Sequence, residues 1–263
     1  MTEKSNNKIL VGPAGSGGGD IKHFEEIKKL GLDAVEIEFV HGIWLDKERA
    51  NIIREANKNL KLKLSINAPY FINLNSEDKQ KVGASRTRIL QSCIIGNELS
   101  NGENIPIVFH PGFYLKSTKQ ECYNKIKEEI LKIQQVIDEK NLKVDLCPET
   151  TGKESQFGSL DEILQLMKDT KCHICVDFEH LKARYNGKIN YDEVMNKIKN
   201  IKNLHAHFSG IEYTEKGERK HLLTQEKDIK ELFHYLKEYN IGVNIINESP
   251  NPFGDAIKIK KLL

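Results

Sequence analysis

Short runs of β-forming residues alternate with long amphipathic stretches along the whole chain. The β-type runs lie at residues 8–13, 34–40, 63–68, 105–110, 143–149, 173–178, 203–208 and 242–248. Regular alternation of this kind is typical of a parallel sheet whose strands are connected by helices. The sequence therefore predicts eight parallel strands.

The stretches between these runs are rich in Lys and Glu and carry apolar residues at three-to-four spacing, which predicts amphipathic helices. Eight strand–helix units fit a closed (β/α)8 barrel, a fold of about 250 residues without sheet edges. We expect an α/β protein, a TIM barrel that forms one catalytic domain over residues 1–263. A doubly wound open sheet is the alternative. The predicted helices are 20–30, 46–60, 86–99, 125–140, 160–169, 191–201, 226–239 and 254–263.

The charge of the chain is almost balanced, with 40 basic and 38 acidic side chains and a net charge of +2. No overall field attracts nucleic acid, so a polyanion would need a local basic patch. No stretch reaches the ~18 apolar residues of a membrane span. The first residues show no apolar signal region or cleavage pattern. We therefore expect a cytoplasmic protein that does not associate with membranes.

Five cysteines, an odd number, are scattered over the chain and predict reduced thiols rather than a disulfide framework. Cys172 and Cys175 form a C-x-x-C inside a predicted strand, so we interpret them as core residues.

The glycine-rich segment 12–20 lacks the spacing of a phosphate-binding loop, and we expect no nucleotide cofactor. The least regular segment, 69–85, is predicted to be a long functional loop after the third strand.

Metal-binding side chains mark the carboxyl ends of the predicted strands, the rim where barrel enzymes place their active sites. Each one alone is unremarkable in a protein. Together they would concentrate buried charge at one mouth unless cations neutralised it. His205 shares a strand face with His207, and we expect it to line the barrel. The candidate ligands are His110, Glu149, Asp177, His180, His207 and Glu248, the Asn67 position, and Glu218 and His221 in the loop after the seventh strand.

Mixed imidazole and carboxylate ligands suit zinc or manganese better than calcium. The candidates are too numerous for one tetrahedral ion, so the sequence predicts a cluster of two or three ions, Zn²⁺ with Mn²⁺ as the alternative. Clusters of divalent ions commonly serve phosphodiester hydrolysis.

Six motifs in order, SINAPYFINL, VFHPG, LCPET, VDFEH, LHAHFSG and INESP, make the chain resemble the endonuclease IV family of apurinic/apyrimidinic endonucleases. The resemblance covers nearly the whole chain and implies a trinuclear-zinc TIM barrel of base excision repair. It implies that His110 and Glu149 serve one zinc, and that Glu149 bridges to a second held by Asp177, His207 and Glu248. The third zinc would take His180 and His221, with Glu218 the nearest acidic candidate, and Glu149 and Glu248 would be catalytic.

Two positions depart from the family pattern. Asn67 stands where the family has His, and an amide oxygen is a poor zinc ligand, so we expect the first metal to be weakly held or absent. The family also has Asp-x-His after the seventh strand, whereas Arg219 lies two residues before His221. The third site is therefore incompletely assigned by sequence.

The resemblance also implies contacts with DNA. Tyr70 and Phe71 match positions that enter the minor groove and stack in place of the displaced abasic nucleotide. An aromatic wedge offsets part of the cost of unstacking, and a missing base lowers that cost. Packing beneath the loop is the alternative role for both aromatics. The candidate phosphate contacts are Lys116, Arg184, Arg219 and Lys220.

Taken together, these features predict a monomeric, metal-dependent deoxyribonuclease that cuts double-stranded DNA 5′ to an abasic site, impaired by Asn67. One alternative is a sugar isomerase or epimerase of the xylose-isomerase-like barrels, with one metal held by Glu149, Asp177, His207 and Glu248. Another is a protein that binds abasic DNA and cuts it poorly. Metal content separates the first two, because one ion per chain favours the isomerase.

Overall fold

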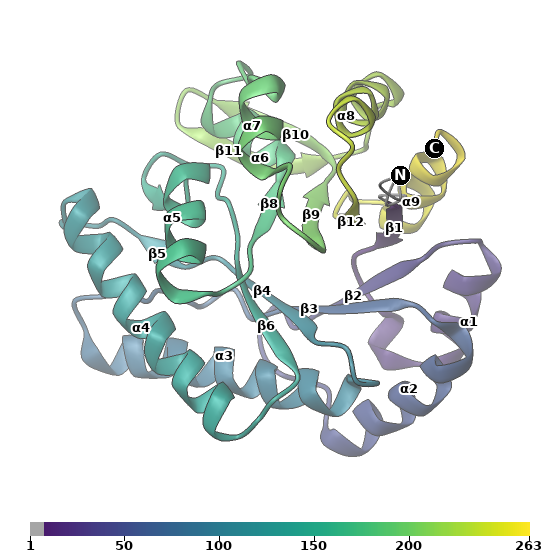
Figure 1. Ribbon diagram of the computed structural model, residues 1–263, viewed down its shortest axis with the longest axis horizontal. Coiled ribbons are helices and arrows are strands. Elements are labelled where there is room, and N and C mark those ends of the chain that lie inside the picture. Colours follow the sequence, from purple (N-terminus) through teal and green to yellow (C-terminus); the bar gives the residue numbers. More distant parts are fainter. Residues whose placement is uncertain (1–7) are drawn as a thin grey trace, which may run out of the picture.

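The computed structural model describes residues 8–263. Residues 1–7, which the predicted domain includes, lie outside the described residues. Eight parallel strands form two four-stranded sheets, in the orders β1-β12-β9-β8 and β2-β3-β4-β6. Parallel bridges between Ala14 and Glu36 and between Glu149 and Cys175 join the two sheets. The strands thus close into a barrel, and the (β/α)8 prediction is confirmed (Figure 1). The barrel strands are β1 Ile9–Pro13, β2 Ala34–Glu38, β3 Lys63–Asn67, β4 Ile105–Phe109, β6 Val144–Pro148, β8 Cys175–Asp177, β9 Leu204–Phe208 and β12 Val243–Asn247.

Helices surround the strands, and the C-terminal helix lies beside β1 (Figure 1). Each helix turns an apolar stripe toward the sheet, as Phe24 and Ile27 do in the first one. In the part of the chain that the structure describes, no helix is long and apolar enough to cross a membrane. The helices are α1 Ile21–Lys29, α2 Lys47–Leu60, α3 Lys79–Leu99, α4 Lys119–Glu139, α5 Leu160–Thr170, α6 Phe178–Arg184, α7 Tyr191–Ile198, α8 Glu226–Glu238 and α9 Pro252–Lys261, with a 3₁₀ turn at Gly17–Gly19.

Side-chain caps define where several helices begin. Thr118 and Glu121 form a capping box at the start of α4, and Ser159 and Glu162 form another at α5. Each such cap satisfies backbone N–H groups that the first turn leaves unpaired, and it contributes about 1 kcal/mol. These caps fix where the loops after β4 and β6 end.

The segment 69–85 differs from its prediction. Asp78 caps α3, so the helix begins at Lys79 and the loop ends there. Residues 79–85 are helical because this cap outweighs the polar Lys-Gln-Lys start and Gly83, which read as loop. The loop after β3 is therefore only the stretch 68–78.

Two antiparallel strand pairs that the sequence pattern does not reveal lie beyond the barrel strands. Gly112–Phe113 (β5) pairs with Gln156–Phe157 (β7), which ties the loop after β4 to the loop after β6. Gly210–Thr214 (β10) pairs with Gly217–Leu222 (β11) in the segment after β9. Both pairs belong to loops at the carboxyl ends of strands, so they shape the mouth of the barrel.

Candidate metal centre

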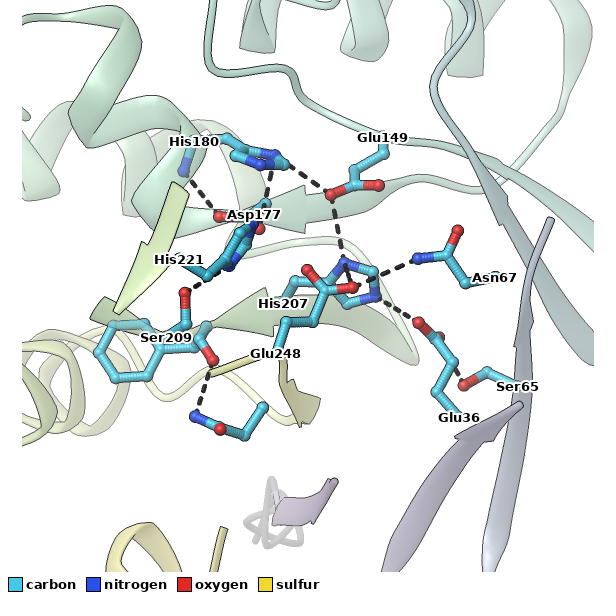
Figure 2. A network of polar contacts seen from close by, with 12 residues as sticks. Glu36, Ser65, Asn67, Glu149, Asp177, His180, His207, Ser209, His221 and Glu248 are labelled. Carbon is cyan, nitrogen blue, oxygen red and sulfur yellow. Dashed lines mark hydrogen bonds and ion pairs between the residues drawn. The ribbon is translucent and has the colours of Figure 1, made fainter. Parts of the chain in front are cut away.

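Four side chains from four different strands meet at the centre of the mouth (Figure 2). Glu149 and Glu248 follow β6 and β12, Asp177 ends β8, and His207 lies in β9. One ligand atom of each lies within 4.8 Å of the others. His207 Nδ1 lies 3.2 Å from Glu149 Oε1 and 3.3 Å from Glu248 Oε1. Three carboxylates and one imidazole at this spacing can hold a divalent cation.

Two further groups share members with this one. His110, Glu149 and His180 form the first, with His110 Nε2 3.1 Å from Glu149 Oε2 and His180 Nδ1 3.2 Å from Glu149 Oε1. Asp177, His180 and His221 form the second. Because Glu149 and Asp177 each belong to two groups, the arrangement suits ions that share carboxylates. The structure thus brings together all the predicted histidine and carboxylate ligands on these strands.

Asp177 Oδ2 and His180 Nε2 are buried and have no hydrogen-bond partner among the described residues. His180 Nδ1 lies 3.0 Å from the carbonyl oxygen of Thr150, which can only accept, so Nδ1 keeps a proton and Nε2 is the nitrogen whose proton a cation would replace. A buried polar atom left unpaired costs about 1–3 kcal/mol. A bound cation would satisfy both atoms, so the donor set fits a metal centre.

The electrostatics of the mouth favour cations. Burial alone would lower the pKa of His180, yet the carboxylates of Asp177 and Glu149 raise it well above its usual range. Burial would raise the pKa of Glu149, but His110 and His207 hold it well below its usual range. Protons on imidazoles therefore balance the carboxylates when no metal is bound. Metal binding should release these protons, as it does wherever imidazole is a ligand.

Asn67 ends β3 beside this group. Its Nδ2 donates to Glu248 Oε1 at 3.3 Å (Figure 2). The amide therefore acts as a donor to a carboxylate where the resemblance implies a metal-binding imidazole. The expected weakening of the first site stays a prediction, which Asn67→His tests.

The β10–β11 hairpin explains how Glu218 reaches the group of Asp177, His180 and His221. The pairing skips Arg219, since Glu212 pairs with Lys220 and Tyr213 with Glu218. Such a bulge adds one residue to β11, so Glu218 and His221 face the same way although they are three residues apart. Glu218 Oε2 lies 3.4 Å from His180 Nε2, and the His221 ring lies 5.4 Å from the His180 ring. Glu218 takes the position that the Asp-x-His spacing would give to residue 219.

Most of the predicted DNA-contact residues are exposed. Tyr70 and Phe71 are 63% and 61% exposed, so the alternative of packing beneath the loop does not hold for them. Phe71 stacks with His41 at 6.2 Å between ring centroids. Lys116 is exposed, and Arg219 and Lys220 both pair with Glu212 at the surface.

Arg184 corrects one prediction, because it is buried and only 7% exposed. Its guanidinium donates to the carbonyl oxygens of Thr151, Lys153 and Gln156, at 3.3, 2.6 and 3.1 Å. It therefore holds the loop after β6 in place and is not free to contact DNA phosphates. Sequence alone placed it at a loop because α6 was not predicted.

Sequence reasoning missed Glu36, a fully buried carboxylate in β2. Ser65 Oγ donates to its Oε2 at 2.7 Å, and His205 Nε2 lies 2.9 Å from the same oxygen. Burial alone would raise the pKa of Glu36, but His207 and His205 lower it below its usual range. The polar residues at alternate positions 36 and 38 of an otherwise apolar strand were the available signal, since they point into the barrel. His205 is buried and lines the barrel beside it.

Comparisons with known proteins assign the chain to a family of TIM barrels. Residues 24–261 match the model of the xylose isomerase-like TIM barrel family. The chain belongs to this family. It is 37% identical to an uncharacterized protein, MJ0133, of Methanocaldococcus jannaschii over 268 aligned residues, covering 96% of each chain. It is 33% identical to a "Probable endonuclease 4" of Aster yellows witches'-broom phytoplasma, over 57% of this chain and 58% of the other.

Solved structures with the same fold include proteins with different names. A crystal structure of SacUVDE matches with a TM-score of 0.74 and 19% identity over 92% of this chain and 83% of the other. A D-tagatose 3-epimerase-like protein matches with a TM-score of 0.71 and 22% identity over 97% and 95%. At these identities the likeness establishes the barrel and leaves the activity to the residues at its mouth.

Proposed function

We propose that this protein is a metal-dependent endonuclease that hydrolyses the DNA backbone 5′ to an abasic site. The observation that carries the proposal is the set of three ligand groups that share Glu149 and Asp177. A mononuclear sugar enzyme has no need of His110, His180 and His221. The similarity to a probable endonuclease 4 supports the same reading.

Zn²⁺ or Mn²⁺ bound by these groups would supply Lewis acidity toward the phosphate oxygens. We assign catalysis to two carboxylates of this chain. The Glu248 side chain is 13% exposed, so it can reach a substrate and accept a proton at a carboxylate oxygen. The Glu149 side chain is 2% exposed and contacts three imidazoles, so it joins the ligand groups and fixes their spacing.

The aromatic side chains beside the mouth support an abasic substrate. The loops after β2 and β3 are tied by a hydrogen bond from Tyr70 N to Val40 O at 2.9 Å. Burial and the nearby carboxylates of Glu38 and Glu248 raise the pKa of Tyr70 to about 12, which places its phenol near the acidic mouth. An exposed aromatic pair next to the metal ligands can stack on the base pairs that lose a stacking partner at an abasic site. Lys116, Arg219 and Lys220 would contact flanking phosphates.

The test is incubation with a duplex that carries one tetrahydrofuran abasic analogue, in the presence of Zn²⁺ or Mn²⁺. We expect a single nick on the 5′ side of the analogue, with a 3′-hydroxyl, seen on a denaturing gel. Glu248→Gln should abolish the nick, whereas Glu129→Gln, which removes a carboxylate on α4 that pairs with Arg86, should keep it. An intact duplex with metal demonstrably bound would refute the proposal.

A sugar epimerase is the second candidate, because Glu149, Asp177, His207 and Glu248 by themselves form a complete set for one ion. Asn67 weakens only the group that contains His110, Glu149 and His180. Epimerases share the fold of this chain. Metal analysis separates the two candidates. One ion per chain together with epimerase activity on ketoses would favour the second, and two or more ions favour the nuclease.

A further inference from the structure

Glu36 contacts two buried histidines in the barrel, His205 and His207. Figure 2 shows Glu36 beside His207, on the side of the ring away from Glu149. Its Oε2 accepts from Ser65 and faces His205 Nε2. Its Oε1 lies 2.9 Å from His207 Nε2, on the side of the ring away from Glu149 and Glu248. The His207 Nε2–H does not point straight at Oε1, so this contact is a close electrostatic one rather than a directed hydrogen bond.

A carboxylate can only accept, so a ring nitrogen that faces it must carry the proton. Both ring nitrogens of His207 face carboxylates, Nε2 facing Glu36 and Nδ1 facing Glu149 and Glu248, so the metal-free ring carries a proton on each. A cation held by Glu149 and Glu248 would replace the proton on Nδ1, which leaves the proton on Nε2 facing Glu36. Nδ1 is the nitrogen that lies 3.2 Å from Glu149 and 3.3 Å from Glu248, inside the four-residue group.

We propose that Glu36 is a positioning residue that fixes the tautomer and the orientation of His207, so that Nδ1 is presented to the metal. The carboxylate acts on the metal through the imidazole, an arrangement that commonly raises the basicity of histidine ligands. The inference rests on the metal centre of the proposed function and does not depend on the substrate.

Two of these residues also belong to a possible inner metal site. Cys175, His205 and His207 offer ligand atoms within 4.8 Å of one another, which could form an inner metal site. Both ring nitrogens of His205 are already engaged, Nε2 by Glu36 at 2.9 Å and Nδ1 by the Asn244 amide at 3.3 Å. The existing contacts therefore favour the positioning role.

The experiment combines ¹⁵N-histidine NMR of the metal-free and the Zn²⁺-bound protein with metal affinity measured by chelator competition. In the wild type, long-range ¹H–¹⁵N correlations should show His205 as the Nε2–H tautomer. They should show His207 with a proton on both nitrogens without metal and on Nε2 alone when Zn²⁺ is bound. In Glu36→Gln the side chain has one acceptor oxygen and one NH₂ group. One of the two histidines should therefore change tautomer or populate two tautomers. Affinity for Zn²⁺ should fall about 10- to 100-fold.

Glu129→Gln is the matched control, because it also removes a paired, mostly buried carboxylate, and it should change neither the tautomers nor the affinity. If Glu36→Gln does not fold, the wild-type spectrum and Ser65→Ala, which removes the donor to Oε2, decide the question. A proton on Nδ1 of His207 in the Zn²⁺-bound wild type overturns the proposal. So does unchanged affinity in folded Glu36→Gln, or loss of one bound ion in Cys175→Ser. Absence of DNA nicking with these results intact would refute the proposed function and leave this inference standing.

Discussion

Restoring an imidazole at position 67 should strengthen metal binding. Asn67 lies at the end of β3 and donates to Glu248, so a side chain there points toward the ligand groups. In Asn67→His the imidazole would add a nitrogen ligand to the group of His110 and Glu149. We expect metal content per chain and the rate of nicking to rise together.

The size of the effect follows from two opposing terms. Structural zinc sites with four ligands bind with about 10–16 kcal/mol, or roughly 3 kcal/mol per ligand. The substitution removes the hydrogen bond from Asn67 to Glu248, which at 3.3 Å and partly buried is worth about 1 kcal/mol. The net gain of about 2 kcal/mol corresponds to roughly 30-fold tighter binding.

The assay is chelator competition for Zn²⁺, with elemental analysis of the dialysed protein and single-turnover nicking of the abasic duplex. Circular dichroism shows whether the variant keeps its fold. A folded Asn67→His protein with unchanged metal content and affinity would show that position 67 does not serve a metal, and the reasoning would be wrong.

Further predictions concern stability and the other residues of the mouth. Zn²⁺ at 100 times its Kd should stabilise the fold by about 2.7 kcal/mol, a rise in melting temperature of about 5–10 °C that a chelator reverses; an unchanged melting curve would contradict the metal centre. Glu218→Gln should weaken Zn²⁺ binding by the group of Asp177, His180 and His221, whereas Arg219→Ala, at the exposed bulge, should not. Equal effects of the two variants in isothermal titration with Zn²⁺ would refute the role of the bulge. Arg184→Ala leaves buried carbonyl oxygens unpaired and should lower the unfolding free energy by about 2–4 kcal/mol in urea titrations; a loss below 1 kcal/mol would contradict its structural role. Burial raises the pKa of Cys122 to about 12 and of Cys172 to about 11, so native thiols should resist DTNB and all five should react after denaturation; rapid reaction of the native protein would contradict this.

The strands and the ligands at their ends were predictable because both follow local rules. β-forming runs mark each strand, and the rim of a barrel gathers whatever follows them. His110, Glu149 and His207 are therefore found from sequence once the register is known. The helices were placed by apolar spacing, although the start of α3 was missed because one cap, Asp78, decides it.

Features that depend on pairing across distant segments were not predictable. The bulge at Arg219 exists only in the β10–β11 pairing, so the sequence could not say that Glu218 and His221 share a face. The role of Glu36 depends on β2 lying across the barrel from β9, 169 residues away at His205. Arg184 was misjudged for the same reason, since its partners come from the loop after β6.

The central claim is that strand ends distant in sequence hold several cations at one mouth. The most direct test is anomalous diffraction from crystals soaked in Zn²⁺ or Mn²⁺. We predict two or more peaks within coordination distance of Glu149, Asp177, His180, His207 and Glu248. Peaks only elsewhere on the molecule, or none at the mouth, would contradict the claim.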